Sequence, residues 1–241
     1  AGFPSYAKLS DKASTIILNC AECEPLLKLH RQLLTMYSFE IMSALDTVAK
    51  ATGATEVIIA VKKSYKSTIE AIESNIASFS NMKISTLPDV YPSGDEIVLI
   101  YEVTKKVIKP GSLPISQGII VYNVETMLNL YYALSNIPVT HKYVTVAGEV
   151  KNPVTLRVPI GTGIKTLTDL AGGILSEDVT YINGGPMTGK ITSPYDVVTK
   201  TTNAILVLKN NNQVVAKKKS KTSISMKRAM SSCCQCQMCT D

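Results

Sequence analysis

The first 137 residues alternate between short apolar runs and amphipathic stretches. The runs are rich in β-branched residues, as in buried strands, and the stretches place apolar residues at helical spacing. The predicted strands are residues 15–18, 57–61, 83–87 and 119–122. The predicted helices are one through Ile41, Leu45 and Val48 that ends at Gly53, one capped by Ser64, and residues 96–106 and 124–135. This alternation predicts an α/β fold with a Rossmann-like, mostly parallel sheet and helices on both faces.

The pattern changes after Asn136-Ile137-Pro138. Two strand-like segments joined by a turn, one short helix and further strands follow within about 65 residues, which predicts a small α+β domain such as a β-grasp. These elements are residues 143–147, 154–158, 164–171, 179–182 and 204–208. We therefore expect an α/β domain over residues 1–137, an α+β domain over residues 138–210 and a polar linker over residues 211–232.

Composition agrees with a globular chain, because 45% of the 241 residues are apolar and 18% are charged. No apolar run has the length of a membrane span and no basic, apolar leader opens the sequence, so we expect no membrane span. The net charge of +6 is concentrated in Lys217, Lys218, Lys219, Lys221, Lys227 and Arg228. No aromatic residues or nucleic-acid-binding motif accompany this cluster, so we expect no nucleic-acid partner. The cluster is typical of a solvated linker or of a docking face for an acidic redox partner.

Four of the six cysteines fall within seven residues, which indicates metal ligation in a reducing compartment rather than a disulfide framework. Cys233, Cys236 and Cys239 form C-x2-C-x2-C, a spacing that lets three thiolates converge on a four-iron cluster, whereas Cys234 is out of register. A fourth ligand is expected beyond Asp241. Residues 233–241 therefore read as the start of a ferredoxin-type iron–sulfur domain, with a zinc site as the alternative.

Polar residues follow the first predicted strand in Asn19-Cys20-Ala21-Glu22-Cys23-Glu24-Pro25. Ligands of open α/β sheets bind at the carboxyl ends of strands. Asn19 can both donate and accept a hydrogen bond, and Glu22 and Glu24 can accept from an amide or a ribose. The alternative is that these residues only begin a helix, with acidic side chains near its positive end and Pro25 in its first turn.

Three more loops carry polar groups at strand ends. Gly94 lets the backbone of the loop before Asp95 and Glu96 approach a ligand closely. Asn123 and Thr126 stand where a strand meets a helix, and free amides there can hold an anion. Lys8 follows a glycine-containing start and is a suitable point charge for a phosphate.

Together these residues resemble one known family. Ala1-Gly2-Phe3-Pro4, residues 19–25, Gly94-Asp95-Glu96, residues 123–126 and Gly184-Gly185-Pro186-Met187 occur in the same order in it. The sequence is similar to the C subunit of the Rnf electron-transport complex and to the cobalamin reductase of propanediol-utilisation microcompartments. The flavoprotein subunit of respiratory complex I is a more distant relative.

The resemblance implies an FMN- and NADH-binding domain, then a β-grasp domain of the soluble-ligand-binding type, then two 4Fe-4S clusters. It places Lys8 near the FMN phosphate and Phe3 against the nicotinamide nucleotide. Glu24 and Glu96 would face that nucleotide as the catalytic pair. The residues expected to line the flavin are Asn19, Glu22, Gly94, Asp95, Asn123 and Thr126.

The implied activity is oxidation of NAD(P)H through FMN, with electrons passed on to the clusters and then to a redox partner protein or a corrinoid. The implied location is the bacterial cytoplasm, at a membrane complex or inside a microcompartment. Two functions stay open: a flavin-dependent oxidoreductase, and a non-catalytic module that binds a ligand or partner. For Gly184-Gly185-Pro186-Met187 the alternatives are a tight turn closing the β-grasp and an interface with the flavin domain or a corrinoid.

Overall fold

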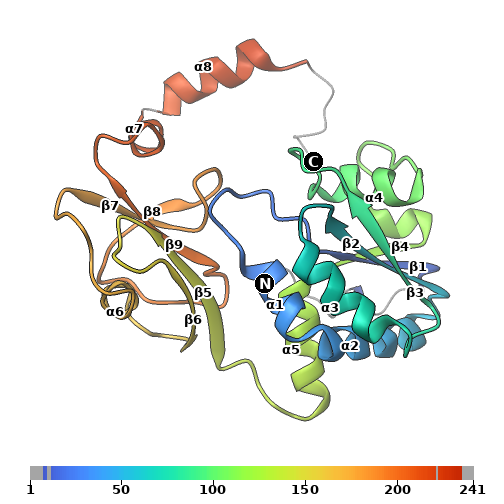
Figure 1. The fold of residues 1–241 in the computed structure, drawn as a ribbon. Coiled ribbons are helices and arrows are strands. Elements are labelled where there is room, and N and C mark those ends of the chain that lie inside the picture. Colours follow the sequence, from blue (N-terminus) through green and yellow to red (C-terminus); the bar gives the residue numbers. More distant parts are fainter. Residues whose placement is uncertain (1–7, 10–11, 221, 235–241) are drawn as a thin grey trace. The chain divides into compact units, whose positions relative to one another are not determined.

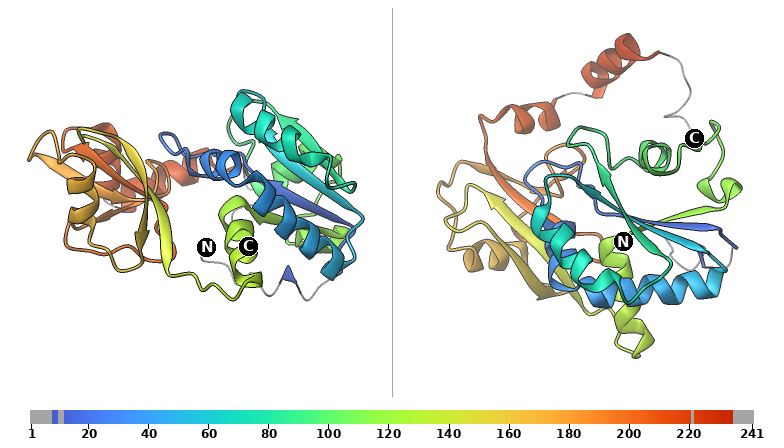
Figure 2. Two further views of the ribbon diagram at one scale, coloured as in Figure 1. Left: turned by 60° about the horizontal axis from the view of Figure 1, so that its bottom comes forward. Right: turned by 45° about the vertical axis from the view of Figure 1, so that its right-hand side comes forward.

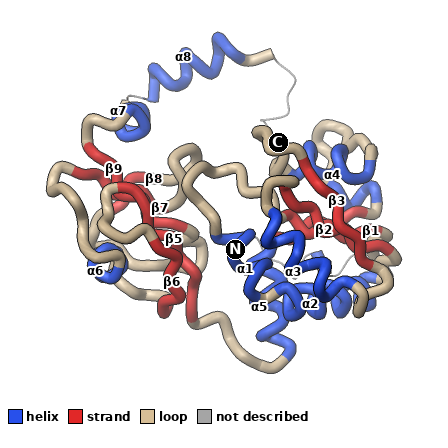
Figure 3. The backbone as a smooth tube through the Cα atoms, viewed as in Figure 1, coloured by secondary structure: helices blue, strands red, loops and turns tan. Residues whose placement is uncertain are grey.

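The computed structural model of the chain describes residues 8–9, 12–220 and 222–234. The chain divides into two compact units, one of residues 1–23 and 28–139 and one of residues 24–27 and 140–241. Both units combine helices with a sheet (Figures 1 and 3). The predicted fold class is confirmed, whereas the predicted domain boundaries stay predictions.

The first unit contains a four-stranded parallel sheet of order β3-β2-β1-β4 (Figure 1). Its strands are β1 (Thr15–Asn19), β2 (Glu56–Lys62), β3 (Met82–Leu87) and β4 (Ile119–Asn123). Its helices are α1 (Leu29–Met36), α2 (Ser38–Thr52), α3 (Lys66–Ile76), α4 (Glu96–Thr104), the 3₁₀ helix η2 (Pro114–Gln117) and α5 (Val124–Leu134). The central strands β1 and β2 are buried along almost their whole length, which explains their near-continuous apolar runs.

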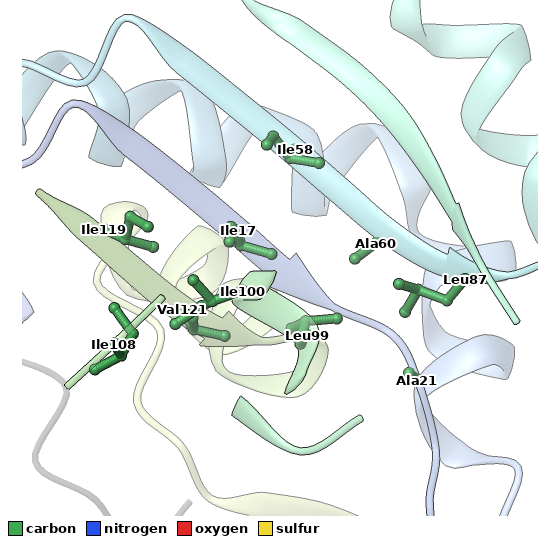
Figure 4. Packing of buried hydrophobic residues seen from close by; sticks show 10 residues of the cluster. All are labelled: Ile17, Ala21, Ile58, Ala60, Leu87, Leu99, Ile100, Ile108, Ile119 and Val121. Carbon is green, nitrogen blue, oxygen red and sulfur yellow. The ribbon is translucent and has the colours of Figure 1, made fainter. Parts of the chain in front are cut away.

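Helices cover both faces of this sheet (Figure 2). On one face, Leu99 and Ile100 of α4 pack against Ile17 and Val121 of the strands (Figure 4). On the other face, α2 packs against β2 and α5 packs against β4, and α1 and α3 pack against each other. The sheet is thereby covered by helices on both faces.

The second unit contains a mixed five-stranded sheet of order β6-β5-β9-β7-β8. Its elements are β5 (His141–Gly148), β6 (Val154–Pro159), α6 (Ile164–Leu170), β7 (Val179–Asn183), β8 (Lys190–Thr192), β9 (Ala204–Lys209), α7 (Gln213–Lys219) and α8 (Thr222–Ser232). Ile164 and Leu167 of α6 pack with Val144 and Val207 of the strands in a separate core. This unit is the predicted small α+β domain.

Three local predictions differ from the structure. The segment predicted as a linker, residues 211–232, holds the helices α7 and α8 (Figure 3). Ser64 does not cap α3, because its hydroxyl donates to Asp89 at 2.5 Å and Tyr65 occupies the N-cap position. Asn19–Pro25 does not begin a helix, since α1 starts only at Leu29.

No helix within the described residues is both long and apolar enough to cross a membrane.

Candidate functional site

The carboxyl ends of β1 and β4 lie next to each other and mark the place where the strand order reverses. From β1 the chain builds β2 and β3 on one side of the sheet and then returns to place β4 on the other side. Asn19 and Asn123, the last residues of β1 and β4, are direct register partners. Such a switch point is where open α/β sheets bind ligands. We call this end of the sheet the β1/β4 edge.

The loops after β1 and before α4 pack closely at the β1/β4 edge. Asn19 donates from Nδ2 to the Gly94 carbonyl at 2.9 Å and accepts from the Ala21 amide at 2.9 Å. The Gly94 amide lies 3.2 Å from Sγ of Cys23, to which it donates. A Cβ on Gly94 would overlap the Ala21 carbonyl oxygen, so only glycine permits this approach.

Two helices begin at this edge and carry predicted site residues at their N-termini. Asp95 caps α4, since its Oδ1 accepts from the amides of Ile97 at 3.1 Å and Val98 at 3.2 Å. Asn123 caps α5 by accepting from the Glu125 amide at 2.9 Å. Thr126 lies in the first turn of α5. Because helix N-termini present amide donors and a positive potential, this edge favours anionic or oxygen-rich ligand groups.

Lys8 supplies a positive charge beside β4. Its Nζ donates to the Val121 carbonyl at 2.8 Å, lies 3.4 Å from Oε1 of Glu96 and lies 6.0 Å from the ring centroid of Tyr122. The Tyr122 hydroxyl is buried and has no hydrogen-bond partner among the described residues. Burial raises the pKa of Tyr122 to about 12, so the hydroxyl stays protonated and can donate to a ligand.

Glu22 occupies a buried position behind the edge. Its Oε1 accepts from the His30 amide at 2.9 Å, and its Oε2 lies 3.5 Å from Nε of Arg31 without a hydrogen-bond partner among the described residues. Burial raises the pKa of Glu22 to about 7, although Arg31 and Lys62 oppose this rise. Burial likewise raises the pKa of the neighbouring Cys20 thiol, which disfavours a reactive thiolate there.

Glu24 belongs to the second unit, where its carboxylate is held by the loop between β7 and β8. It accepts from the amides of Met187 at 2.9 Å and Thr188 at 2.7 Å and from the Thr188 hydroxyl. Partial burial alone would raise the pKa of Glu24, but these hydrogen bonds lower it below the ordinary value. A Cβ on Gly185 would overlap this carboxylate, which gives that glycine of the Gly184–Met187 motif a structural role.

A comparison with protein families matches residues 1–132 to the Nuo51 FMN-binding domain, which is more than half of the chain. The chain belongs to this family. Residues 143–190 match the SLBB domain.

Two curated relatives of this FMN-binding domain protein match most of the chain. The chain is 38% identical to cobalamin reductase PduS of Citrobacter freundii over 243 residues, covering 100% of this chain and 53% of that protein. It is 32% identical to the C subunit of the Na(+)-translocating ferredoxin:NAD(+) oxidoreductase complex of Acetobacterium woodii, covering 90% of this chain and 50% of that relative. The chain thus spans about half the length of the curated relatives it matches.

A solved structure shows the same fold. A chain of an NAD+-reducing [NiFe]-hydrogenase in the H2-reduced state superposes with a TM-score of 0.73 at 20% identity, covering 88% of this chain and 44% of that chain.

Within the FMN-binding domain, the structure brings most predicted site residues to one place. Direct contacts and strand register gather Lys8, Asn19, Gly94, Asp95, Glu96, Asn123 and Thr126 at the β1/β4 edge, with Glu22 behind it. Glu24 is the exception, because its carboxylate bonds to the second unit. Phe3, Cys236 and Cys239 lie outside the described residues, and Cys233 is exposed after α8. Within the described residues, no group of three or more His, Cys, Asp or Glu side chains could hold a metal ion.

Sequence reasoning missed the residues that surround Glu22. His30 links two parts of the site, since its amide donates to Glu22 and its Nε2 accepts from Nδ2 of Asn123 at 3.0 Å. Arg31 stacks on Tyr65 with its guanidinium carbon 4.7 Å from the ring centroid. The helical spacing of Leu29, Leu33 and Leu34 is the signal that predicts α1. His30 and Arg31 follow Leu29 in this helix.

Proposed function

We propose that this chain binds FMN at the β1/β4 edge and serves, within a longer protein, to transfer electrons from a nicotinamide nucleotide to iron–sulfur clusters. The observation that carries this proposal is the meeting of Asn19 and Asn123 at the point where the strand order reverses. The family assignment of residues 1–132 supports the choice of FMN.

The residues present fit a flat, polar ligand such as an isoalloxazine ring. Two buried polar atoms, the Tyr122 hydroxyl and Oε2 of Glu22, have no hydrogen-bond partner among the described residues and would gain from a ligand with donors and acceptors. Gly94 lets its loop pack directly on the Ala21 carbonyl at this edge, where a Cβ would overlap the carbonyl oxygen. The N-termini of α4 and α5 and the charge of Lys8 favour electron-rich ring oxygens and a phosphate.

The residues proposed to hold FMN are Lys8, Asn19, Glu22, Gly94, Asp95, Asn123 and Thr126. Bound FMN supplies the conversion between two-electron and one-electron transfer. Glu96, paired with Lys8, is proposed to orient the nicotinamide nucleotide, and so is Phe3. For Glu24 the same role requires its carboxylate to leave Met187 and Thr188. Cys233, Cys236 and Cys239 are proposed as ligands of a 4Fe-4S cluster that is completed by the longer protein.

The terminal acceptor is proposed to be a redox partner protein or a corrinoid. The name of one relative, cobalamin reductase, supports the corrinoid, and the name of another, a ferredoxin:NAD(+) oxidoreductase complex, supports NADH and a redox protein. Both relatives belong to bacteria, and we propose a bacterial cytoplasmic location at a membrane complex or in a microcompartment.

A non-catalytic binding module is the second candidate. The side-chain amides of Asn19 and Asn123 already bond to Gly94, Ala21, Glu125 and His30, as they would in a purely structural role. In that case the SLBB-type unit would carry the binding function.

An FMN titration of the chain tests the proposal, with two asparagines as a matched pair. Asn123 and Asn212 both cap a helix by accepting from the amide two residues on, but only Asn123 lies at the β1/β4 edge. Each change to alanine should cost about 1 kcal/mol of stability. We expect Asn123→Ala to weaken FMN binding at least tenfold and Asn212→Ala to leave it unchanged. The change in flavin fluorescence on binding provides the measurement.

Reduction by NADH separates the two candidate functions. Anaerobic bleaching of bound flavin by NADH supports the electron-transfer function. Binding of FMN without bleaching supports the non-catalytic module, and an equal loss of affinity in both asparagine variants would remove the β1/β4 edge as the site.

A further inference from the structure

The carboxyl group of Glu22 is buried with only part of its hydrogen-bonding capacity used. Its side chain is 6% exposed. Oε1 accepts one backbone hydrogen bond, from His30, whereas Oε2 has no hydrogen-bond partner among the described residues and lies 3.5 Å from the guanidinium of Arg31. Buried carboxylates are stable when both oxygens are paired, so this environment disfavours the charged form.

The charged and titratable groups around Glu22 come from every neighbouring element. They are Cys20 after β1, Lys28 before α1, His30 and Arg31 of α1, Lys62 at the end of β2 and Tyr65 at the start of α3. Two of these cations, Lys62 and Arg31, also interact with groups other than the Glu22 carboxylate. Nζ of Lys62 donates to the backbone carbonyl of Glu22 at 2.8 Å, and Arg31 stacks on Tyr65. Their attraction therefore does not overcome the cost of burial.

His30 connects this carboxyl group to the β1/β4 edge. Its backbone amide donates to Glu22, and its ring accepts from Asn123, the strand-end residue opposite Asn19. Because an amide NH2 can only donate, Nε2 of His30 carries no proton in this arrangement. A change of charge at the edge thus reaches Glu22 through a single intervening residue.

We propose that Glu22 takes up one proton when two electrons arrive at the β1/β4 edge and releases it when they leave. This inference rests on the proposed function. A hydride from a nicotinamide nucleotide carries two electrons and one proton, so the edge gains one negative charge. A proton from solvent then forms an O–H bond on Glu22 and balances that charge. When the two electrons pass on singly, this bond breaks and both protons return to solvent.

The first test is a carboxyl titration of the flavin-free chain by ¹³C NMR with labelled glutamate. We expect one glutamate to titrate with a midpoint near 7, in agreement with the raised pKa of Glu22, and its signal to be absent from Glu22→Gln. Arg31→Gln should move the midpoint upward, because it removes a cation that favours the charged form. This second variant assigns the signal even if Glu22→Gln does not fold. A midpoint in the ordinary range of glutamate would overturn the inference.

The second test is the midpoint potential of the FMN-loaded chain as a function of pH. The wild-type plot should change slope near the Glu22 midpoint, and Glu22→Gln should lose this break. Glu24→Gln is the matched control, since it removes a carboxylate of the same loop that has a lowered pKa, and it should keep the break. An unchanged plot in Glu22→Gln would overturn the coupling. Failure of FMN to bind would instead overturn the proposed function and the coupling with it, while the NMR titration would still decide whether Glu22 holds a proton.

Discussion

Glu22 and Glu24 are two positions apart in the sequence, yet the chain holds their carboxylates in opposite ways. Burial raises the pKa of Glu22 from 4.5 to about 7. A raised pKa means that its contribution to stability is fully present below the unfolded-state pKa and is lost as pH rises through 7. Glu22→Gln should therefore match the wild type near pH 4 and be more stable by about 2–3 kcal/mol at pH 8. Urea unfolding followed by circular dichroism measures this, because the chain has no tryptophan.

Glu24→Gln serves as the control, because its effect on stability at pH 8 should be opposite in sign to that of Glu22→Gln. Hydrogen bonds lower the pKa of Glu24, so its contribution is present above the unfolded-state pKa and is lost as pH falls through the folded-state value. This variant should be less stable than the wild type at pH 8, by about 1 kcal/mol or less because solvent screens this partly exposed carboxylate, and should converge with it in acid. Parallel pH profiles for the two variants would contradict both assignments.

Gly94 shows how one missing side chain shapes the site. A Cβ there would overlap the carbonyl oxygen of Ala21, a backbone atom that cannot rotate away. We expect Gly94→Ala to destabilise the first unit by about 2 kcal/mol or more and to abolish FMN binding, through overpacking of two loops. Gly163→Ala is the control, since its Cβ would meet only Thr166 at 3.6 Å, and it should cost less than about 1 kcal/mol. Thermal unfolding and flavin titration of both variants provide the measurements, and equal losses would show that the contact at Gly94 is not decisive.

At the scale of elements, the loop between β7 and β8 depends on a segment far away in the sequence. The amides of Met187 and Thr188 both donate to Glu24. Glu24→Ala should accelerate hydrogen exchange at these two amides by about tenfold or more, because it removes their acceptor. Thr188→Val removes only the hydroxyl contact and should leave both amides protected. Unchanged exchange in Glu24→Ala would mean that the loop holds its shape without this carboxylate.

The elements that the sequence predicts best are those whose stability is local. β1, β2 and β4 were found from apolar, β-branched runs because both faces of the sheet are covered. α1 was missed because it is 8 residues long and its N-cap, Lys28, makes no side-chain cap hydrogen bond. β8 was missed because its 3 residues are Lys190, Ile191 and Thr192, which show no strand pattern and become a strand only by pairing with β7.

At the scale of the molecule, the sequence located the strand ends of the site but not the contacts between them. Asn19 and Asn123 could be predicted because parallel strands end at one edge of a sheet. The pairing of His30 with Asn123 and the stacking of Arg31 on Tyr65 join elements whose proximity depends on packing. The polar segment Asn19–Pro25 predicts Glu24 at the same strand end as Glu22, whereas the chain passes between these two residues into the second unit.

The basic segment after β9 consists of two helices with different roles. Val215 of α7 is fully buried in a cluster with Ala147, Ile182, Leu206 and Leu208. Lys218 of the same helix donates to the carbonyls of Met187 and Gly189 at 3.3 and 2.5 Å. In α8, by contrast, residues 223–232 are all exposed. α7 is thus part of the second unit, whereas the described side chains of α8 contribute little to its core.

Truncation separates these two helices. Ending the chain after Ser220 should leave the stability of the second unit unchanged within about 0.5 kcal/mol, because the side chains that the structure describes in α8 are exposed. Ending it after Asn210 removes Val215 and Lys218 and should cost about 2.5–6 kcal/mol, from about 1.5–3 kcal/mol for one buried aliphatic side chain and about 0.5–1.5 kcal/mol for each of two part-exposed hydrogen bonds. Val215→Ala isolates the first contribution and should cost about 2 kcal/mol in the full chain. Urea unfolding and limited proteolysis of the three variants test this order. Equal losses for the two truncations would mean that α8 carries the stability attributed here to α7.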